Sequence, residues 1–302
     1  TVANNNDFFI LSVAKECYVG RDKHIEQVDL VPIDIWDFVE AVVTIEVITR
    51  AWNRKILVHC CAGQSRAPTF IGAWYIYHGM SVDEYLKQFN ITLNPIMVEN
   101  LRRWENWLIG MRDVLRYYMV QFEAANAEPN DYKPAYEMAL SRLNVLRKYL
   151  DSGNVLLIGG TKPEYDAFSQ YYNVDVINVN IFRKVGKFVL FEYYNPGKKY
   201  DAIAAFDIFE HTLSPFATIA KAREVLKDDG LLYFSSPTIN DPNQHIPWHT
   251  SLMHKEEWYY LLDYFSFDRV YEENDPYRIT GIWRKGKIKK YESYMKLLKL
   301  KD

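Results

Sequence analysis

The sequence contains little cysteine. Among its 302 residues there are three, Cys17, Cys60 and Cys61. An odd number with two adjacent members does not make a disulfide framework of the kind that stabilises small secreted domains. We therefore expect a protein of a reducing compartment, the cytoplasm, in which hydrophobic cores and not cross-links stabilise the fold.

Long hydrophobic runs and a strong net charge are also missing. The apolar stretches are well short of the ~20 residues that a membrane-spanning helix needs, and no signal peptide is visible. Lys and Arg number 36 against 39 Asp and Glu, and the net charge of −3 argues against a general nucleic-acid binder. We expect neither a membrane nor a nucleic-acid partner. At ~150 residues a domain, the length suggests about two domains.

The stretch 55–69, KILVHCCAGQSRAPT, has the most specific pattern in the chain. Residues 55–58 are mainly apolar and predict a buried strand, and residues 67–77 predict an apolar helix with Pro68 in its first turn, where proline is tolerated. Small or polar residues lie between them. The predicted order is strand, loop and helix, with Cys60 at the strand end and Arg66 at the helix start.

This loop has the composition of a phosphate cradle. Gly63 permits a backbone conformation that other residues avoid, so successive amide N–H groups can point toward an anion, as does the positive end of the helix. The guanidinium of Arg66 can pair with two phosphate oxygens. The same positive field favours the thiolate form of Cys60, which can attack phosphorus. The predicted phosphate-binding residues are Cys61, Ala62, Gly63, Gln64, Ser65 and Arg66.

The segment VHCCAGQSRAPT resembles the signature loop of the cysteine-dependent tyrosine and dual-specificity phosphatases, which is His-Cys, five residues and Arg. The resemblance implies that Cys60 is the nucleophile of a phospho-cysteine intermediate and that Arg66 binds substrate and transition state. Ala67 stands where the family usually has Ser or Thr, and the Arg-Ala-Pro triplet is similar to that of the phosphatases of regenerating liver. The alternative is a structural cysteine beside a surface arginine, which would not need the glycine loop.

Such an enzyme needs an acid that protonates the leaving oxygen. By resemblance this acid is an Asp on a loop, roughly 25 to 32 residues before the cysteine. Asp34, 26 positions before Cys60 and just after a Pro-Ile pair, is the first choice. Asp37 is the second, although we expect it to cap a helix over 37–52. Asp29 is the third, because it alternates with apolar residues in an expected strand over 26–33.

The resemblance also bears on redox control and on substrate. The phosphatases of regenerating liver have a second cysteine at a similar strand end, which implies a reversible disulfide between Cys17 and Cys60 here. A buried, unpaired Cys17 is the alternative. The loop carries no Lys, which disfavours highly charged phosphoinositides. A phosphorylated protein or a small phosphomonoester is the expected substrate, with no cofactor.

The rest of the first domain shows further helix signals. Ser81 and Glu84 form a capping-box pattern, and Asn94-Pro95 opens a helix that is expected to end near Tyr118. On that helix Asn100 lies near where some of these phosphatases have a water-positioning glutamine, but a position on the solvated face is the preferred expectation. We predict a phosphatase-type domain over 1–120, a polar linker over 121–134 and a second domain over 135–302.

The second domain alternates strands and helices. Buried strands are expected over 154–160, 174–180 and 231–237 and within 200–211, with helices over 134–150 and 215–226. This alternation predicts an open parallel sheet covered by helices. The fold class is therefore α/β with two domains, namely a phosphatase-type mixed or parallel sheet flanked by helices, and a Rossmann-like sheet.

The segment YDAIAAFDIFEHTLSPFATIAKAREVLKDDGLLYFSSP resembles the central part of class I S-adenosylmethionine-dependent methyltransferases. This resemblance implies S-adenosylmethionine as the cofactor, bound by Gly159, Gly160, Asn180 and Asp207. Two positions depart from the family pattern: Leu157 replaces an acid before the glycine loop, and Asn180 replaces the Asp or Glu that binds the ribose. A scaffold without methyl-transfer activity therefore remains an alternative.

Histidines suggest a metal site, which we do not predict. The spacing from His245 to His249 is helical, but Pro247 disfavours a helix, and no cysteine lies near these residues or His254. The main functional hypothesis is a cysteine-dependent protein phosphatase fused to a methyltransferase-like domain. Methyl transfer as the main activity, a binding module, and an RNA 5′-triphosphatase joined to a methyltransferase are the alternatives.

Overall fold

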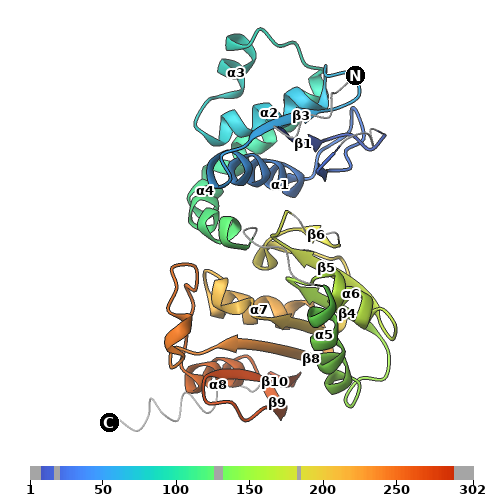
Figure 1. Cartoon of the computed structure of the whole chain (residues 1–302), viewed down its shortest axis with the longest axis vertical. Helices are drawn as coiled ribbons and strands as arrows, with labels where there is room; N and C mark the ends of the chain where they lie inside the picture. The colour runs from blue at the N-terminus through green and yellow to red at the C-terminus, as the bar shows by residue number, and fades with distance from the viewer. Residues whose placement is uncertain (1–7, 17–20, 126–131, 182–184, 289–302) are drawn as a thin grey trace. The chain divides into compact units, whose positions relative to one another are not determined.

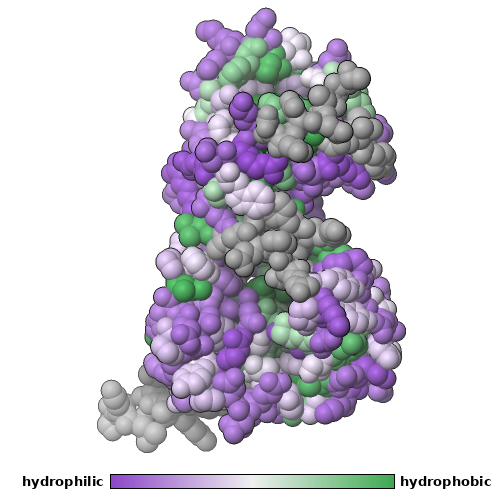
Figure 2. Space-filling view, viewed as in Figure 1, coloured by the Kyte–Doolittle hydropathy of each residue, from purple (hydrophilic) through white to green (hydrophobic). Residues whose placement is uncertain are grey.

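The computed structural model describes residues 8–16, 21–125, 132–181 and 185–288 (Figure 1). The chain divides into two compact units. The first comprises Thr1–Pro129 with Val179–Phe182, and the second comprises Asn130–Asn178 with Arg183–Asp302. In the described part of the chain no helix is long and apolar enough to cross a membrane. Figure 2 shows hydrophilic residues over most of the visible surface of each unit.

The first unit contains a small parallel sheet and four α-helices. The strands β1 (Phe8–Ser12), β2 (Lys23–His24) and β3 (Lys55–His59) lie in the order β2-β1-β3. The helices are α1 (Ile35–Glu46), which continues into a π-helical turn η1 (Val47–Ala51), then α2 (Arg66–Tyr77), α3 (Val82–Gln88) and α4 (Pro95–Ala125).

Aromatic side chains from three helices make the centre of this unit. Phe38 of α1, Phe70 of α2 and Trp104 of α4 are fully buried, with ring centroids of Phe38 5.2 Å from Phe70 and 5.6 Å from Trp104. The indole N–H of Trp104 donates to the carbonyl of Ala73, 2.9 Å away. Burial of such large rings, with the polar N–H satisfied, supplies much of the stability of a core.

Several expected element bounds are confirmed and others are wrong. The capping box of Ser81 and Glu84 is present at the start of α3. Residues 121–125 are helix and not linker, because α4 continues through Ala125 and Phe122 is fully buried. In the described residues β3 pairs with β1 alone, so it is an edge strand, and Leu57 is 37% exposed where a buried strand was expected.

The expected strand over 26–33 is absent, and this matters for the site. The pairing of β2 with β1 ends at His24, and residues 25–34 run as an irregular segment with a turn at Asp29 and Leu30. Leu30 has φ of +56°, which no strand accommodates. Alternation of polar and apolar residues predicted the strand, but there is no neighbouring strand to pair with it in the described residues.

The second unit is a seven-stranded sheet in the order β6-β5-β4-β7-β8-β10-β9, as Figure 1 shows in part. Neighbours from β6 to β8 are parallel, and β10 is antiparallel to both of its neighbours. The strands are β4 (Asn154–Ile158), β5 (Asn173–Asn178), β6 (Lys187–Phe188), β7 (Tyr200–Phe206), β8 (Leu226–Pro237), β9 (Phe267–Glu272) and β10 (Arg278–Lys285). The predicted Rossmann-like α/β sheet is confirmed.

Helices cover both faces of this sheet. The helices are α5 (Tyr132–Leu146), α6 (Lys162–Phe168), α7 (Pro215–Val225) and α8 (Lys255–Tyr264), with 3-10 turns η2 (Phe191–Tyr193), η3 (Phe209–His211) and η4 (Pro242–Gln244). Leu143 of α5 and Phe168 of α6 pack with Leu157 of β4 on one face. Trp258 of α8 packs against Phe234 of β8, with ring centroids 5.4 Å apart.

The strand order places a switch point between β4 and β7. The chain leaves β4 through α6 toward β5 on one side, whereas β7 and β8 extend the sheet on the other side. In open α/β sheets the ends of the strands at such a point diverge and form a crevice where ligands bind. The residues that follow β4 and β7 therefore lie where a ligand site is expected.

Candidate functional site

In the first unit, the loop of residues 60–65 joins β3 to α2. Its start is fixed by the sheet, since the backbone N–H of Val13 donates to the carbonyl of His59 at 2.9 Å. Cys60 is 8% exposed, whereas Cys61, Ala62, Gly63 and Gln64 are all exposed. The thiol of Cys60 thus lies at the buried end of an exposed loop, and the expected strand, loop and helix are present.

The cysteines differ from the expected pairing. Cys60 is a free thiol, whereas its neighbour Cys61 takes part in a disulfide bond. The prediction that Cys60 forms a disulfide with Cys17 is therefore wrong. Cys17 itself lies outside the described residues.

Gly63 has the backbone conformation that the loop requires. Its φ is +71°, in the left-handed region that glycine adopts without strain, and a Cβ there would meet no atom within 4 Å. Its backbone conformation, and not a shortage of space, accounts for glycine at this position.

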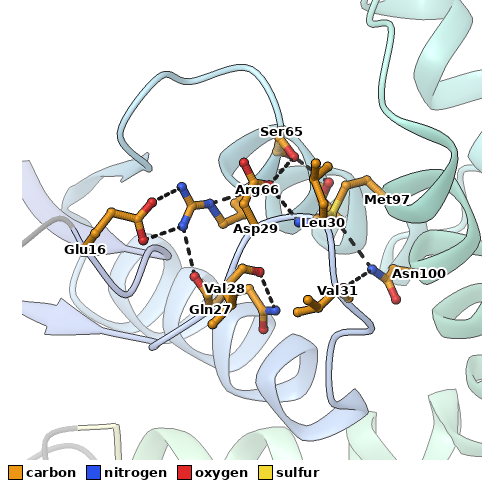
Figure 3. Close-up of polar contacts among 11 residues, drawn as sticks. Glu16, Gln27, Val28, Asp29, Leu30, Val31, Ser65, Arg66, Met97 and Asn100 are labelled. Atoms are coloured by element: carbon orange, nitrogen blue, oxygen red, sulfur yellow. Dashed lines mark hydrogen bonds and ion pairs between the residues drawn. The ribbon is translucent and has the colours of Figure 1, made fainter.

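The side chain of Arg66 is buried and held by a carboxylate (Figure 3). Nη1 donates to Oε2 of Glu16 at 2.8 Å and to the carbonyl of Gln27 at 3.0 Å, and Nη2 donates to Oε1 of Glu16. The hydrogen bond from Arg66 lowers the pKa of Glu16 to about 2, and the same bond raises the pKa of Arg66. The Glu16 side chain is 54% exposed, so an anion from solvent can compete with it for the guanidinium.

Asp29 is the candidate acid that contacts the loop. Its Oδ1 accepts a hydrogen bond from the Ser65 hydroxyl at 2.8 Å and lies 3.8 Å from Nε of Arg66, as Figure 3 shows. That Nε is buried and has no hydrogen-bond partner. Asp29 was the last of the three sequence candidates because it was expected in a strand, whereas the turn at Leu30 brings it to the loop.

Asp34 has the role that was expected of Asp37. Its carboxylate caps α1 by accepting a hydrogen bond from the backbone N–H of Trp36 at 2.9 Å, and Asp37 lies within the first turn of the helix. The helix therefore begins at Ile35, two residues earlier than predicted. The capping prediction was right about the chemistry and wrong about the residue.

Asn100 of α4 holds the segment that follows Asp29. It is 2% exposed, its Nδ2 donates to the carbonyl of Val31 at 3.0 Å, and its Oδ1 accepts from the N–H of Ile33 at 3.1 Å. The expected solvated position was wrong. The two hydrogen bonds tie the irregular segment to the long helix, so Asn100 fixes the segment that carries Asp29.

Replacing Asn100 by alanine is expected to lower the free energy of unfolding by about 2 kcal/mol, because the buried N–H of Ile33 and the partly buried carbonyl of Val31 lose their partner. Urea unfolding followed by circular dichroism measures this loss. Glu99→Ala changes the exposed neighbour on the same helix and serves as the matched control. Equal stability of the two variants would contradict a stabilising role for the two hydrogen bonds of Asn100.

In the second unit, the turn after β4 needs glycine at two positions. Gly159 has φ of +70°, and a Cβ there would lie 2.1 Å from Cδ1 of Ile208. A Cβ on Gly160 would lie 2.8 Å from Cβ of Leu157 and 2.9 Å from Cγ1 of Val176. The first glycine permits the turn and a close approach of Ile208, the second residue after β7, and the second glycine permits close packing of β4 and β5.

Asp207, the first residue after β7, is held by basic side chains. It forms an ion pair with Arg278, lies 3.7 Å from Nη2 of Arg142, and its Oδ1 accepts from the Ser235 hydroxyl at 3.3 Å. The structure therefore places Gly159, Gly160 and Asp207 on the edge where β4 and β7 end. Asn180, which is 8% exposed, belongs to the segment grouped with the first unit.

A cluster that the sequence analysis missed follows β7. One ligand atom each of Glu210, His211 and His249 lies within 4.8 Å of the other two. Burial raises the pKa of Glu210 to about 8 and lowers that of His211 to about 4. The prediction considered His245, His249 and His254, but the carbonyl of Ile239 lies 2.7 Å from Nε2 of His245. The Glu-His pair directly after a strand was the signal that could have found this cluster.

Comparison with known proteins shows the family to which the chain belongs. A family model described as a methyltransferase domain matches residues 106–274, which is more than half of the chain, so the chain belongs to this family. The match begins after the loop of Cys60 and Arg66, which it does not cover. No curated protein matches the chain.

Solved structures resemble it at low identity. N-methyltransferase NodS from Bradyrhizobium japonicum WM9 is 15% identical, covers 52% of this chain and 100% of its own, and has a TM-score of 0.41. The DhpI–SAH complex structure is 15% identical, covers 57% and 96%, and has a TM-score of 0.45. An S-adenosylmethionine-dependent methyltransferase from Clostridium acetobutylicum ATCC 824 is 11% identical, covers 58% and 99%, and has a TM-score of 0.42. Likeness at this level does not bear on activity.

Proposed function

We propose that the second unit binds S-adenosylmethionine and transfers its methyl group. The observation that carries the proposal is the glycine turn after β4, at the switch point of a sheet that belongs to the methyltransferase domain family. The φ of Gly159 and its lack of a side chain suit a backbone that approaches a ligand closely.

The residues fit the cofactor in part. Gly159 and Gly160 would lie against its amino-acid end. At the end of β5, where a carboxylate that binds both ribose hydroxyls is typical, the second unit has the amide of Asn178. An amide accepts through one oxygen only and carries no charge, so a weaker hold on the ribose is expected. When bound, the cofactor supplies the electrophilic methyl group.

Calorimetric titration of the full chain with S-adenosylhomocysteine tests this proposal. We expect saturable one-to-one binding, weakened about tenfold or more in Gly159→Ala, whose Cβ would lie 2.1 Å from Cδ1 of Ile208 and disturb the turn. Asn243→Ala, on the exposed surface of the second unit, is the matched control. Absence of saturable binding would leave the unit as a scaffold with the methyltransferase fold.

A second function is favoured by the arrangement around Cys60. We infer that the first unit hydrolyses phosphate monoesters through a phospho-cysteine intermediate. The supporting observation is that a free, buried Cys60, the left-handed Gly63 and the buried Arg66 occupy one loop, with the Asp29 carboxylate hydrogen-bonded to it.

In this mechanism the thiolate of Cys60 attacks phosphorus as the bond from phosphorus to the ester oxygen breaks. The phosphate takes over the two contacts that Glu16 makes with Arg66, and the loop amides bind its remaining oxygens. Asp29, and not Asp34, donates a proton to the leaving oxygen, since it lies at the loop and Asp34 caps a helix. Water then attacks phosphorus and gives a proton to the carboxylate of Asp29, the bond between phosphorus and sulfur breaks, phosphate is released and the thiolate of Cys60 is regenerated.

The substrate class follows from the rim of this loop. Residues 61–64 are exposed and carry no charge, so they offer no extra cationic contact to a highly phosphorylated ligand. A phosphorylated protein or a small phosphomonoester is therefore the proposed substrate.

A further inference from the structure

The cluster of Glu210, His211 and His249 is assembled by two separate segments. The turn η3 directly after β7 supplies Glu210 and His211, and the segment between η4 and α8 supplies His249. The backbone joins the two segments, since the N–H of Ser251 donates to the carbonyl of Glu210 at 2.9 Å. The cluster is therefore held together by backbone hydrogen bonding between the two segments at this edge of the sheet.

The two imidazoles are oriented by backbone carbonyls. Nδ1 of His211 lies 3.0 Å from the carbonyl oxygen of Trp248, and Nδ1 of His249 lies 2.9 Å from that of Gln244. A carbonyl accepts only, so each Nδ1 carries the proton and each Nε2 keeps a lone pair. Histidines that bind metal ions typically donate their other ring N–H to a carbonyl or carboxylate in this way. The rings cross edge to face with centroids 4.7 Å apart.

The third member is a buried acid. Glu210 is 1% exposed and accepts a hydrogen bond from the Ser236 hydroxyl at 3.1 Å. Within the residues that the structure describes, no Lys or Arg forms an ion pair with its side chain. A buried carboxylate normally has a cation or several donors, because its desolvation is costly.

We propose that Glu210, His211 and His249 bind a divalent transition-metal ion, with zinc as the best fit. One carboxylate and two neutral imidazoles form a ligand set typical of zinc sites that keep a coordination position open. No cysteine belongs to the cluster, so the closed four-ligand arrangement of structural zinc is not formed by these residues. The open position is available to water or to an oxygen or nitrogen atom of a ligand.

The location gives the site a use beyond stability. Glu210 and His211 lie two and three positions after Ile208, whose side chain packs over Gly159 at the switch point. The metal would therefore lie on the same edge of the sheet as the glycine turn. Metal binding does not depend on the proposed methyl transfer and can be measured without the methyl donor.

The test is titration of the full chain, freed of metal by a chelator, with Co²⁺ and with Zn²⁺. We expect one ion per chain and a Co²⁺ absorption spectrum of nitrogen and oxygen ligands, without the sulfur-to-metal band that Cys60 or Cys61 would give. Glu210→Gln keeps the shape and the Ser236 contact but loses the charge, and it should weaken binding about 100-fold, as should His249→Gln.

Two matched variants separate this site from adventitious binding. His245→Gln removes a nearby exposed histidine outside the cluster, and Cys60→Ser removes a thiol, and both should bind as the unchanged chain does. Binding that survives Glu210→Gln and His249→Gln, or no stoichiometric binding, would overturn the proposal. Binding of S-adenosylhomocysteine by the metal-free chain is measured separately. This measurement tests the proposed methyltransferase function independently of the metal site.

Discussion

Replacing Cys60 by serine is expected to reduce the hydrolysis of para-nitrophenyl phosphate by about 10³-fold or more in kcat. A serine hydroxyl is a much poorer nucleophile toward phosphorus than a cysteine sulfur. Vanadate binding should survive, because the left-handed turn at Gly63 and the guanidinium of Arg66 are unchanged. Steady-state kinetics with the full chain measures the first effect, and vanadate inhibition or calorimetry measures the second.

Cys61 provides the matched control for this experiment. It is the exposed neighbour of Cys60, and under reducing conditions Cys61→Ser should keep most of the activity. If Cys60→Ser retained more than a few per cent of the activity, the nucleophile would have to be assigned elsewhere. If both variants lost activity and vanadate binding together, damage to the loop would explain the result instead.

Replacing Asp29 by asparagine is expected to slow the hydrolysis of aryl phosphates with poor leaving groups by about 10²-fold, and much less for good leaving groups. The reason is that a poor leaving oxygen needs the proton that Asp29 donates. A series of substituted phenyl phosphates measures the rates for poor and for good leaving groups.

The variant Asp34→Asn tests whether Asp34, the acid preferred in the sequence analysis, has the role that we propose for Asp29. Asparagine caps a helix about as well as aspartate, so α1 should remain stable and the rates nearly unchanged. A leaving-group effect in Asp34→Asn, with none in Asp29→Asn, would return the role to Asp34. Equal slowing of good and poor leaving groups by Asp29→Asn would indicate that Asp29 positions Ser65 and Arg66 and is not the acid.

Local chemistry was sufficient to predict many elements of both units. The capping box at Ser81 and Glu84, the loop and helix after β3, and the strands β4, β5 and β7 each follow from side chains a few residues apart. Helix caps and hydrophobic periodicity act over one or two turns, so a sequence reveals them directly. The α/β class followed because these elements alternate along the chain.

The sequence by itself determined the residue types of the candidate sites, and tertiary structure decided which of them meet. Asp29 lies by the loop because a turn replaces the expected strand, and Asn100 is buried because α4 passes under residues 31–33. His249 meets Glu210 and His211 from a segment 38 positions away from His211, through the hydrogen bond of Ser251. Such contacts depend on where strands end in a sheet, and local propensity does not encode that position.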